Sequence, residues 1–205
     1  MKIAVIAPTT IPSRRANTFQ VMKMSQALVE TGHIVRLIAQ PAAKMTAPKA
    51  NPNGSEWETL AEHYGLNPAA RFEIMWLSAQ DRLRRYDFGW RAVRIARQWK
   101  ADLLYTRLPQ AGAIASQAGM PTVLEVHDLP QGKVGNLLFR SFVNGRGAYR
   151  LVVITRALVD DLRARFSLPE PENSDPARPF TIIAPDGVDL ARYQDLHRPL
   201  AARQA

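Results

Sequence analysis

Short apolar runs alternate with longer amphipathic stretches along nearly the whole chain. Between the runs, apolar residues recur at helical spacing, as Val21, Met24 and Leu28 do before Gly32. Strands that alternate with helices predict a parallel sheet. The expected fold class is therefore α/β, a doubly wound, mostly parallel seven-stranded Rossmann-like sheet with helices on both faces. The seven runs that predict strands are 2–7, 34–39, 72–77, 103–105, 122–126, 151–154 and 180–184.

The strand order predicted for such a sheet brings three loops to one edge. In open parallel sheets, ligands bind beyond the carboxyl ends of the strands, where the strand order reverses. We expect that reversal between the first and fourth strands. Residues 8–17, the strand tip at Thr106 and Arg107, and the strand tip at His127 and Asp128 would then surround one crevice.

Residues 121–128 carry the strongest sign of chemistry. Here an apolar run ends in three ionisable residues, Glu125, His127 and Asp128. Packing alone does not account for such groups at the end of a buried strand. His127 has the chemistry to orient a substrate hydroxyl or to transfer a proton. The alternative is that His127 and Asp128 only cap the loop that follows.

The polar loop 8–17 is a second candidate site. It leads into the N-terminus of a predicted helix, where free backbone N–H groups favour an anion. Arg14 and Arg15 add guanidinium groups that suit phosphate or carboxylate, although both side chains also fit the pattern of solvated loop charges. The sequence has no Gly-x-Gly-x-x-Gly after the first strand and no Walker sequence, which argues against dinucleotide and P-loop sites.

Residues 82–100 are predicted to form the longest helix, and this helix has two apolar stripes. One stripe must face the sheet. The other either packs under a loop or remains free for a partner or a lipid surface. The stripes are Phe88, Ala92, Ile95 and Trp99, and Tyr86, Trp90 and Val93, with Arg91 and Arg94 between them.

The composition narrows the partners and the compartment. The formal net charge is +9, from 27 Lys and Arg against 18 Asp and Glu, which indicates phosphate-bearing partners or a solvated basic surface. The absence of cysteine excludes disulfides and thiolate metal sites, and the four histidines have no metal-ligand spacing. No apolar run approaches the roughly 20 residues of a membrane span, and the start lacks a signal-peptide core. A cytoplasmic protein is expected.

The motifs taken together resemble the N-terminal, acceptor-side half of a GT-B glycosyltransferase of family 4. The order and spacing of the matching segments make the resemblance specific, and it extends from Met1 to about Tyr193. The matching segments are Ile3–Pro8, Ser13–Met24, Thr31–Val35, Tyr64–Leu66, Tyr105–Arg107, Glu125–Asp128 and Pro185–Asp189.

The resemblance implies transfer of a sugar from a nucleotide-sugar donor, with retention at the anomeric carbon. The acceptor would be a glycan, a lipid-linked sugar or a small molecule, and no metal, other cofactor or nucleic acid is expected. By resemblance, His127 is the catalytic residue that faces the donor sugar. The expected substrate-binding residues are Arg14, Arg15, Asn17, Arg107, Glu125 and Asp128, and the expected donor-side, interdomain residues are Asp186, Gly187 and Asp189.

The same resemblance predicts the domain organisation. Residues 1–190 would form the Rossmann-like domain and residues 191–205 a linker or tail, with the C-terminal donor-binding domain absent. Such a chain is not expected to turn over nucleotide sugars alone. The first loop also departs from the family, because Arg-Arg-Ala-Asn at 14–17 replaces a frequent Gly-Gly pair.

Two alternatives and one further partner remain open. The chain would otherwise be a non-catalytic Rossmann-like module that binds a phosphorylated or lipid-linked ligand, or an unrelated Rossmann-type enzyme such as a dehydrogenase. The missing glycine fingerprint argues against a dehydrogenase. The basic excess also predicts peripheral contact with an anionic membrane at its inner face, although a soluble acceptor fits the other features equally well.

Overall fold

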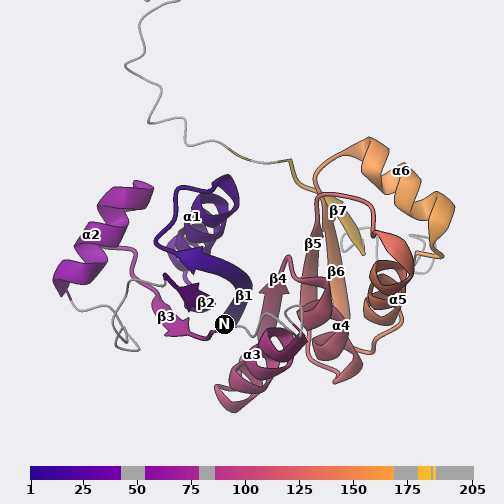
Figure 1. Cartoon of the computed structure of the whole chain (residues 1–205), viewed down its shortest axis with the longest axis horizontal. Coiled ribbons are helices and arrows are strands. Elements are labelled where there is room, and N and C mark those ends of the chain that lie inside the picture. The colour runs from indigo at the N-terminus through magenta and orange to yellow at the C-terminus, as the bar shows by residue number, and fades with distance from the viewer. Residues whose placement is uncertain (43–53, 79–85, 169–179, 186, 188–205) are drawn as a thin grey trace, which may run out of the picture.

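The computed structural model contains one parallel sheet of seven strands in the order β3-β2-β1-β4-β5-β6-β7 (Figure 1). The structure describes residues 1–42, 54–78, 86–168, 180–185 and 187. The strands are β1 (Lys2–Ile11), β2 (Ile34–Pro41), β3 (Glu73–Trp76), β4 (Leu103–Thr106), β5 (Thr122–Val126), β6 (Ala148–Val153) and β7 (Thr181–Ile183). The predicted fold class is confirmed.

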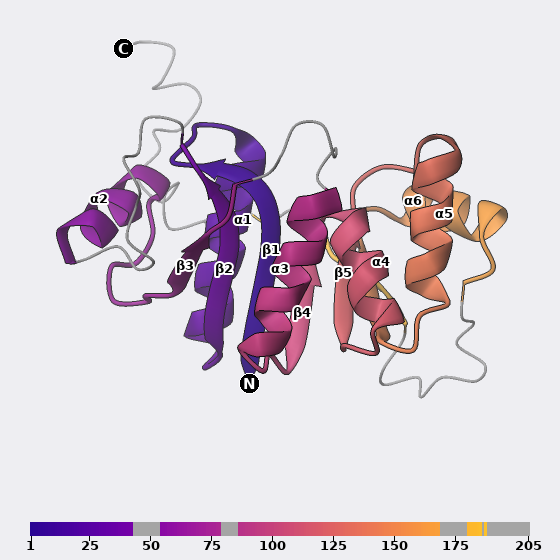
Figure 2. The same ribbon diagram turned by 60° about the horizontal axis from the view of Figure 1, so that its bottom comes forward.

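Helices cover both faces of this sheet. Figure 2 shows α3, α4 and α5 in front of the sheet and α1 behind it. The helices are α1 (Ala16–Glu30), α2 (Gly54–Tyr64), α3 (Tyr86–Gln98), α4 (Pro109–Gln117), α5 (Gly132–Val143) and α6 (Arg156–Arg165).

Alternation along β1 divides the core between the two faces. Ile3 and Val5 pack with α1 and α2, whereas Ala4 and Ile6 pack with α3 and α4. All four of these side chains are buried, as expected for a central strand of a parallel sheet. A third apolar cluster packs α5 and α6 against β5 and β6.

The strand order reverses between β1 and β4, where the pattern predicted it. β1 pairs with β2 on one side and with β4 on the other, and Ile6 lies opposite Thr106 at the carboxyl end. The Thr106 hydroxyl donates to the Ile6 carbonyl at 2.8 Å. The reversal therefore places the ends of β1, β4 and β5 at one edge.

β1 is longer than the strand predicted at 2–7. The prediction of a loop at 8–17 was wrong for residues 8–11, which belong to β1. The strand continues to Ile11 because pairing with β2 resumes at Thr10 and Ile11 after an irregularity. Proline has no N–H to donate to a neighbouring strand. Pro8 is tolerated in β1 because it lies in the irregularity, where the regular pairing with β2 is interrupted. Its carbonyl accepts from the Gln40 side chain at 2.8 Å.

The two predicted stripes of the helix at 82–100 meet different surroundings. Phe88 and Ala92 are buried on the sheet side, while Tyr86 and Trp90 are exposed. Val93 is buried, so its assignment to the second stripe was wrong. Residues 82–85 of the predicted helix lie outside the described residues. Within the described residues, α3 has 13 residues and α1 has 15, so α3 is not the longest helix there.

Candidate functional site

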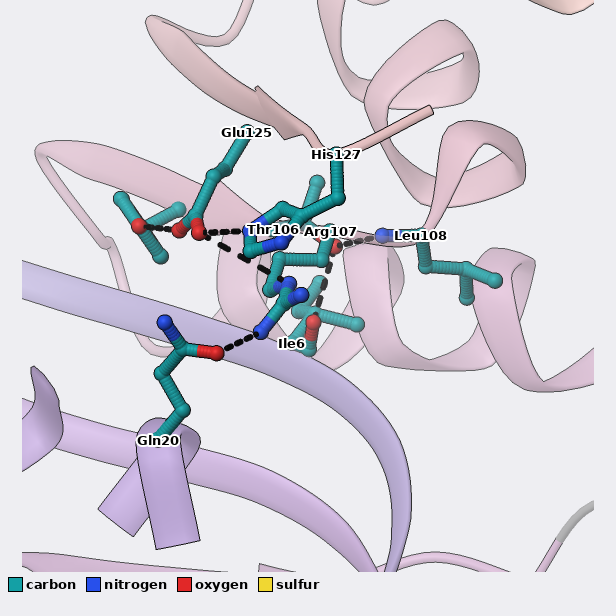
Figure 3. Close-up of polar contacts among 8 residues, drawn as sticks. Ile6, Gln20, Thr106, Arg107, Leu108, Glu125 and His127 are labelled. Carbon is teal, nitrogen blue, oxygen red and sulfur yellow. Dashed lines mark hydrogen bonds and ion pairs between the residues drawn. The ribbon is translucent and has the colours of Figure 1, made fainter. Parts of the chain in front are cut away.

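A buried carboxylate, that of Glu125, lies at the centre of the candidate site. One of its oxygens, Oε2, accepts a hydrogen bond from the Tyr105 hydroxyl. The other, Oε1, contacts Nε2 of His127 and lies 3.8 Å from Nε of Arg107 (Figure 3). The Glu125 side chain is only 7% exposed, so these partners replace the water it would otherwise bind.

The sheet itself brings these residues together. β4 and β5 are parallel neighbours, with Thr106 opposite Leu124, so the residues that follow both strands meet at one edge. Arg107 follows β4, and His127 follows β5. A carboxylate that accepts from Nε2 fixes which ring nitrogen of His127 carries the proton. The arrangement is an oriented imidazole beside a buried negative charge.

Arg107 also reaches across the strand reversal. Its terminal guanidinium nitrogen donates to Oε1 of Gln20, on α1, at 2.7 Å. The backbone beside it is held as well, because the Leu108 N–H donates to the Thr106 hydroxyl at 3.0 Å. Arg107 therefore joins the β1–α1 half of the domain to the β4–β5 half.

A pocket of about 290 Å³ opens at this edge. Such a volume is at the small end for ligand pockets in proteins. Most of its wall is apolar, and three of its polar residues, Arg107, Glu125 and His127, lie against one another, a combination typical of binding sites. The pocket is lined by Arg107, Pro109, Leu124, Glu125, Val126, His127, Asp128, Leu129, Pro130, Gln131, Gly135 and Phe139.

The other predicted site residues lie elsewhere. Arg14, Arg15 and Asn17 are exposed at the start of α1 and do not line this pocket. Gly187 is exposed, and Asp186 and Asp189 lie outside the described residues. The structure thus brings together Arg107, Glu125, His127 and Asp128, and the roles of all these residues stay predictions.

Two residues of the site were missed by the sequence reasoning. Tyr105 belongs to a predicted strand and to the matching segment Tyr105–Arg107, but it is not among the predicted site residues. Gln20 carries no signal in the pattern, because its approach to Arg107 depends on how α1 packs. Among the described residues, no group of three or more His, Cys, Asp or Glu side chains is placed to hold a metal ion.

The start of α1 is held by a buried tyrosine. The Tyr64 hydroxyl accepts from the Ser13 N–H at 2.7 Å and donates to the Ser13 carbonyl at 3.2 Å. Thr9 and Thr18 add a buried hydroxyl pair at 2.5 Å. These contacts join α2 and the end of β1 to the segment that carries Arg14 and Arg15.

Burial raises the pKa of Tyr64 above its ordinary value of 10.0, and the hydrogen bond with Ser13 lowers it by less. Above pH 10.0 the unfolded tyrosine therefore loses its proton before the folded one. The folded state then binds more protons, so the free energy of unfolding should fall as the pH rises through this window. Tyr64→Phe should lack this slope and should cost about 1 kcal/mol at neutral pH.

Urea unfolding on either side of pH 10.0 measures this slope. Tyr149→Phe is the matched control, because it removes a tyrosine hydroxyl from a side chain that is 46% exposed on β6. A Tyr64→Phe variant whose stability falls as steeply as that of the wild type would show that another group titrates.

Comparison with known proteins gives one family and one fold. The family model for the glycosyl transferase 4-like domain matches residues 18–173. No curated protein matches the sequence significantly. A glycosyltransferase from Rickettsia africae ESF-5 superposes with a TM-score of 0.60 at 10% identity, covering 99% of this chain and 48% of its own.

Two further solved structures share the fold. Sucrose-phosphate synthase from Thermosynechococcus elongatus gives a TM-score of 0.58 at 14% identity, over 93% of this chain and 49% of its own. Anabaena HepE, solved in complex with UDP and glucose, gives a TM-score of 0.54 at 19% identity. The match covers 100% of this chain and 49% of HepE. The chain thus spans about half the length of these three proteins.

Proposed function

Because the chain belongs to the glycosyl transferase 4-like domain family, we propose that it forms the acceptor-binding half of a retaining glycosyltransferase. The donor is a nucleotide sugar, held by a second domain across the cleft. Two observations support the assignment of the acceptor to this chain and of the donor to a second domain. The chain spans about half of the Rickettsia glycosyltransferase and about half of HepE, and HepE was solved with UDP and glucose.

The observation that carries the proposal is the oriented imidazole of His127, which lines the pocket beside the Glu125 carboxylate. In sugar transfer an acceptor hydroxyl bonds to the anomeric carbon while the bond to the nucleoside diphosphate breaks. The hydroxyl proton leaves with the diphosphate or passes to water. A histidine held by Glu125 is suited to orient a sugar hydroxyl through this change.

The remaining pocket walls also suit a saccharide. Sugar rings have polar edges and apolar faces, so they need hydrogen-bonding groups beside apolar surfaces. Asp128 supplies an acceptor, and Pro130 and Phe139 supply apolar surface in the same pocket. Arg107 is held by Glu125 and Gln20, so its main role here is to position Glu125.

The proposal is tested by a transfer assay that follows nucleoside diphosphate release and incorporation of labelled sugar. The complete polypeptide that contains this chain should release nucleoside diphosphate in proportion to added acceptor. Residues 1–205 alone should show no turnover above a His127→Ala control, because the donor is proposed to be held by the second domain and must be aligned with the acceptor for transfer.

Two outcomes would contradict the proposal. Robust transfer or donor hydrolysis by residues 1–205 alone would show that the chain is not half of a site. A complete polypeptide that binds a phosphorylated or lipid-linked ligand in this pocket, yet never transfers sugar, would favour the non-catalytic binding module.

A further inference from the structure

Three helices form one continuous layer on the face of the sheet opposite α1. Figure 2 shows α3, α4 and α5 side by side in front of the strands. α3 packs against α4, and α4 packs against α5. The side chains that point away from the sheet in this layer therefore make up a single surface of the molecule.

The charges on these three helices are almost all positive. Asp87 is the only acidic residue in them; its side chain is 9% exposed and lies 3.9 Å from Arg91. α4 carries no charged residue at all. The positive residues of the layer are Arg91, Arg94, Arg97, Lys133 and Arg140.

Large apolar side chains stand exposed on the same layer. Trp90 on α3 is 54% exposed, and the Arg94 guanidinium lies 5.4 Å from the centre of its ring. On α5, Val134 is 56% and Leu137 is 68% exposed. Single exposed apolar residues are common on protein surfaces, but here they coincide with a surface that lacks exposed acidic groups.

This combination matches the chemistry of an anionic bilayer surface. Tryptophan favours the headgroup level, valine and leucine favour the acyl boundary, and arginine contacts lipid phosphates. The layer also reaches the pocket, because Gly135 and Phe139 of α5 line it. No helix in the described parts of the chain is long and apolar enough to cross a bilayer.

We propose that the α3–α4–α5 layer docks on the surface of an anionic lipid bilayer. Trp90, Val134 and Leu137 enter the boundary between headgroups and acyl chains, while the arginines of α3 contact anionic headgroups. The pocket then opens beside the lipid surface, where it meets an acceptor sugar carried on a lipid. Docking itself does not depend on the proposed catalytic function.

Co-sedimentation of the 205-residue chain with vesicles tests the docking. The two vesicle types are phosphatidylcholine alone and phosphatidylcholine mixed with phosphatidylglycerol, each at low and at high salt. The chain should bind the anionic vesicles only, and high salt should weaken that binding by screening the surface charge. Equal binding to both vesicle types, or binding to neither, would overturn the proposal.

Charge variants locate the contact on the molecule. Each cation beside an anionic leaflet strengthens binding by roughly fivefold, so a triple glutamine variant of Arg91, Arg94 and Arg97 should bind roughly 10²-fold more weakly. The matched control removes the same charge from α6, at Arg156, Arg163 and Arg165, which are exposed. If the α6 variant loses as much binding as the α3 variant, the layer is not the docking surface.

Apolar variants separate docking from simple charge attraction. Trp90→Ser and Leu137→Ser keep every charge, and each should reduce the binding that remains at high salt by severalfold. Unchanged binding in both would overturn the insertion of these side chains. Sugar transfer to a soluble acceptor without any vesicle binding would reject the docking and leave the proposed function intact.

Discussion

Replacing His127 with alanine should lower the kcat of sugar transfer by about 10²-fold or more and leave the acceptor KM little changed. The reason is that the imidazole lines the pocket with its Nε2 held by the Glu125 carboxylate. A group placed to act on the reacting sugar contributes more in the transition state than in acceptor binding. Steady-state kinetics of the complete polypeptide measure both constants.

His33→Ala is the matched control, because His33 precedes β2 at the opposite edge of the sheet. It should leave both kinetic constants unchanged. An unchanged kcat in His127→Ala would return His127 to the alternative in which it only caps the loop after β5.

Glu125 variants test whether the carboxylate positions the histidine. Glu125→Gln keeps the shape of the side chain but replaces one accepting oxygen with an NH₂ donor. This change matters because Tyr105, Arg107 and His127 all approach that carboxylate. We expect kcat to fall about tenfold with KM little changed, and Glu125→Asp to recover part of the loss. Nitrogen NMR should show a proton on Nε2 of His127 in the wild type, and this signature should be lost in Glu125→Gln.

Replacing Gly147 with alanine should destabilise the domain by about 3 kcal/mol or more. A Cβ at this position would lie 2.1 Å from the carbonyl oxygen of Met120 and 2.7 Å from its backbone N and C. These are backbone atoms, so no flexible side chain is available to move aside. The local backbone is also fixed, because Gly147 donates to Ser116 at 2.9 Å and accepts from Thr122 at 2.8 Å.

Thermal unfolding measures this effect, and the expected fall in Tm is roughly 6–12 °C. Gly135→Ala is the matched control. Gly135 lies inside α5, and a Cβ there would approach Pro130 no closer than 3.4 Å. Alanine is the better helix former, so this control should be neutral or slightly stabilising. A Gly147→Ala variant as stable as the wild type would show that the backbones at Gly147 and Met120 are not packed so closely.

The alternation of strands and helices could be predicted because it depends on properties that are local in the sequence. Short β-branched runs separated by helical patterns leave a parallel, doubly wound sheet as the expected arrangement. The end of β1 could not be predicted, since Pro8 suggests a break and only the pairing of Thr10 and Ile11 with β2 extends the strand. The burial of Val93 likewise depends on the packing of neighbouring helices and not on its place in the helical repeat.

The candidate site could be predicted as far as it depends on strand ends. Arg107, Glu125 and His127 meet because β4 and β5 are parallel neighbours, and a strand order is enough to infer that. The contact of Gln20 with Arg107 depends on the orientation of α1, which no sequence pattern specified. The position of loop 8–17 after the first strand also predicted Arg14 at the crevice; Arg14 is exposed just before α1 and does not line the pocket, and its role stays a prediction.

The contact of Arg107 with Gln20 has a consequence for folding. These residues are 87 positions apart, and the bond from Thr106 to Ile6 spans 100. Contacts between such distant segments form late, because the intervening chain must lose entropy before they are made. The β4–α4–β5 segment has the short-range contacts to form earlier. The contact of Arg107 with Gln20 should therefore be among the last features acquired, and a chain arrested before β1 joins β4 would hold His127 beside Glu125 without the link from Arg107 to α1.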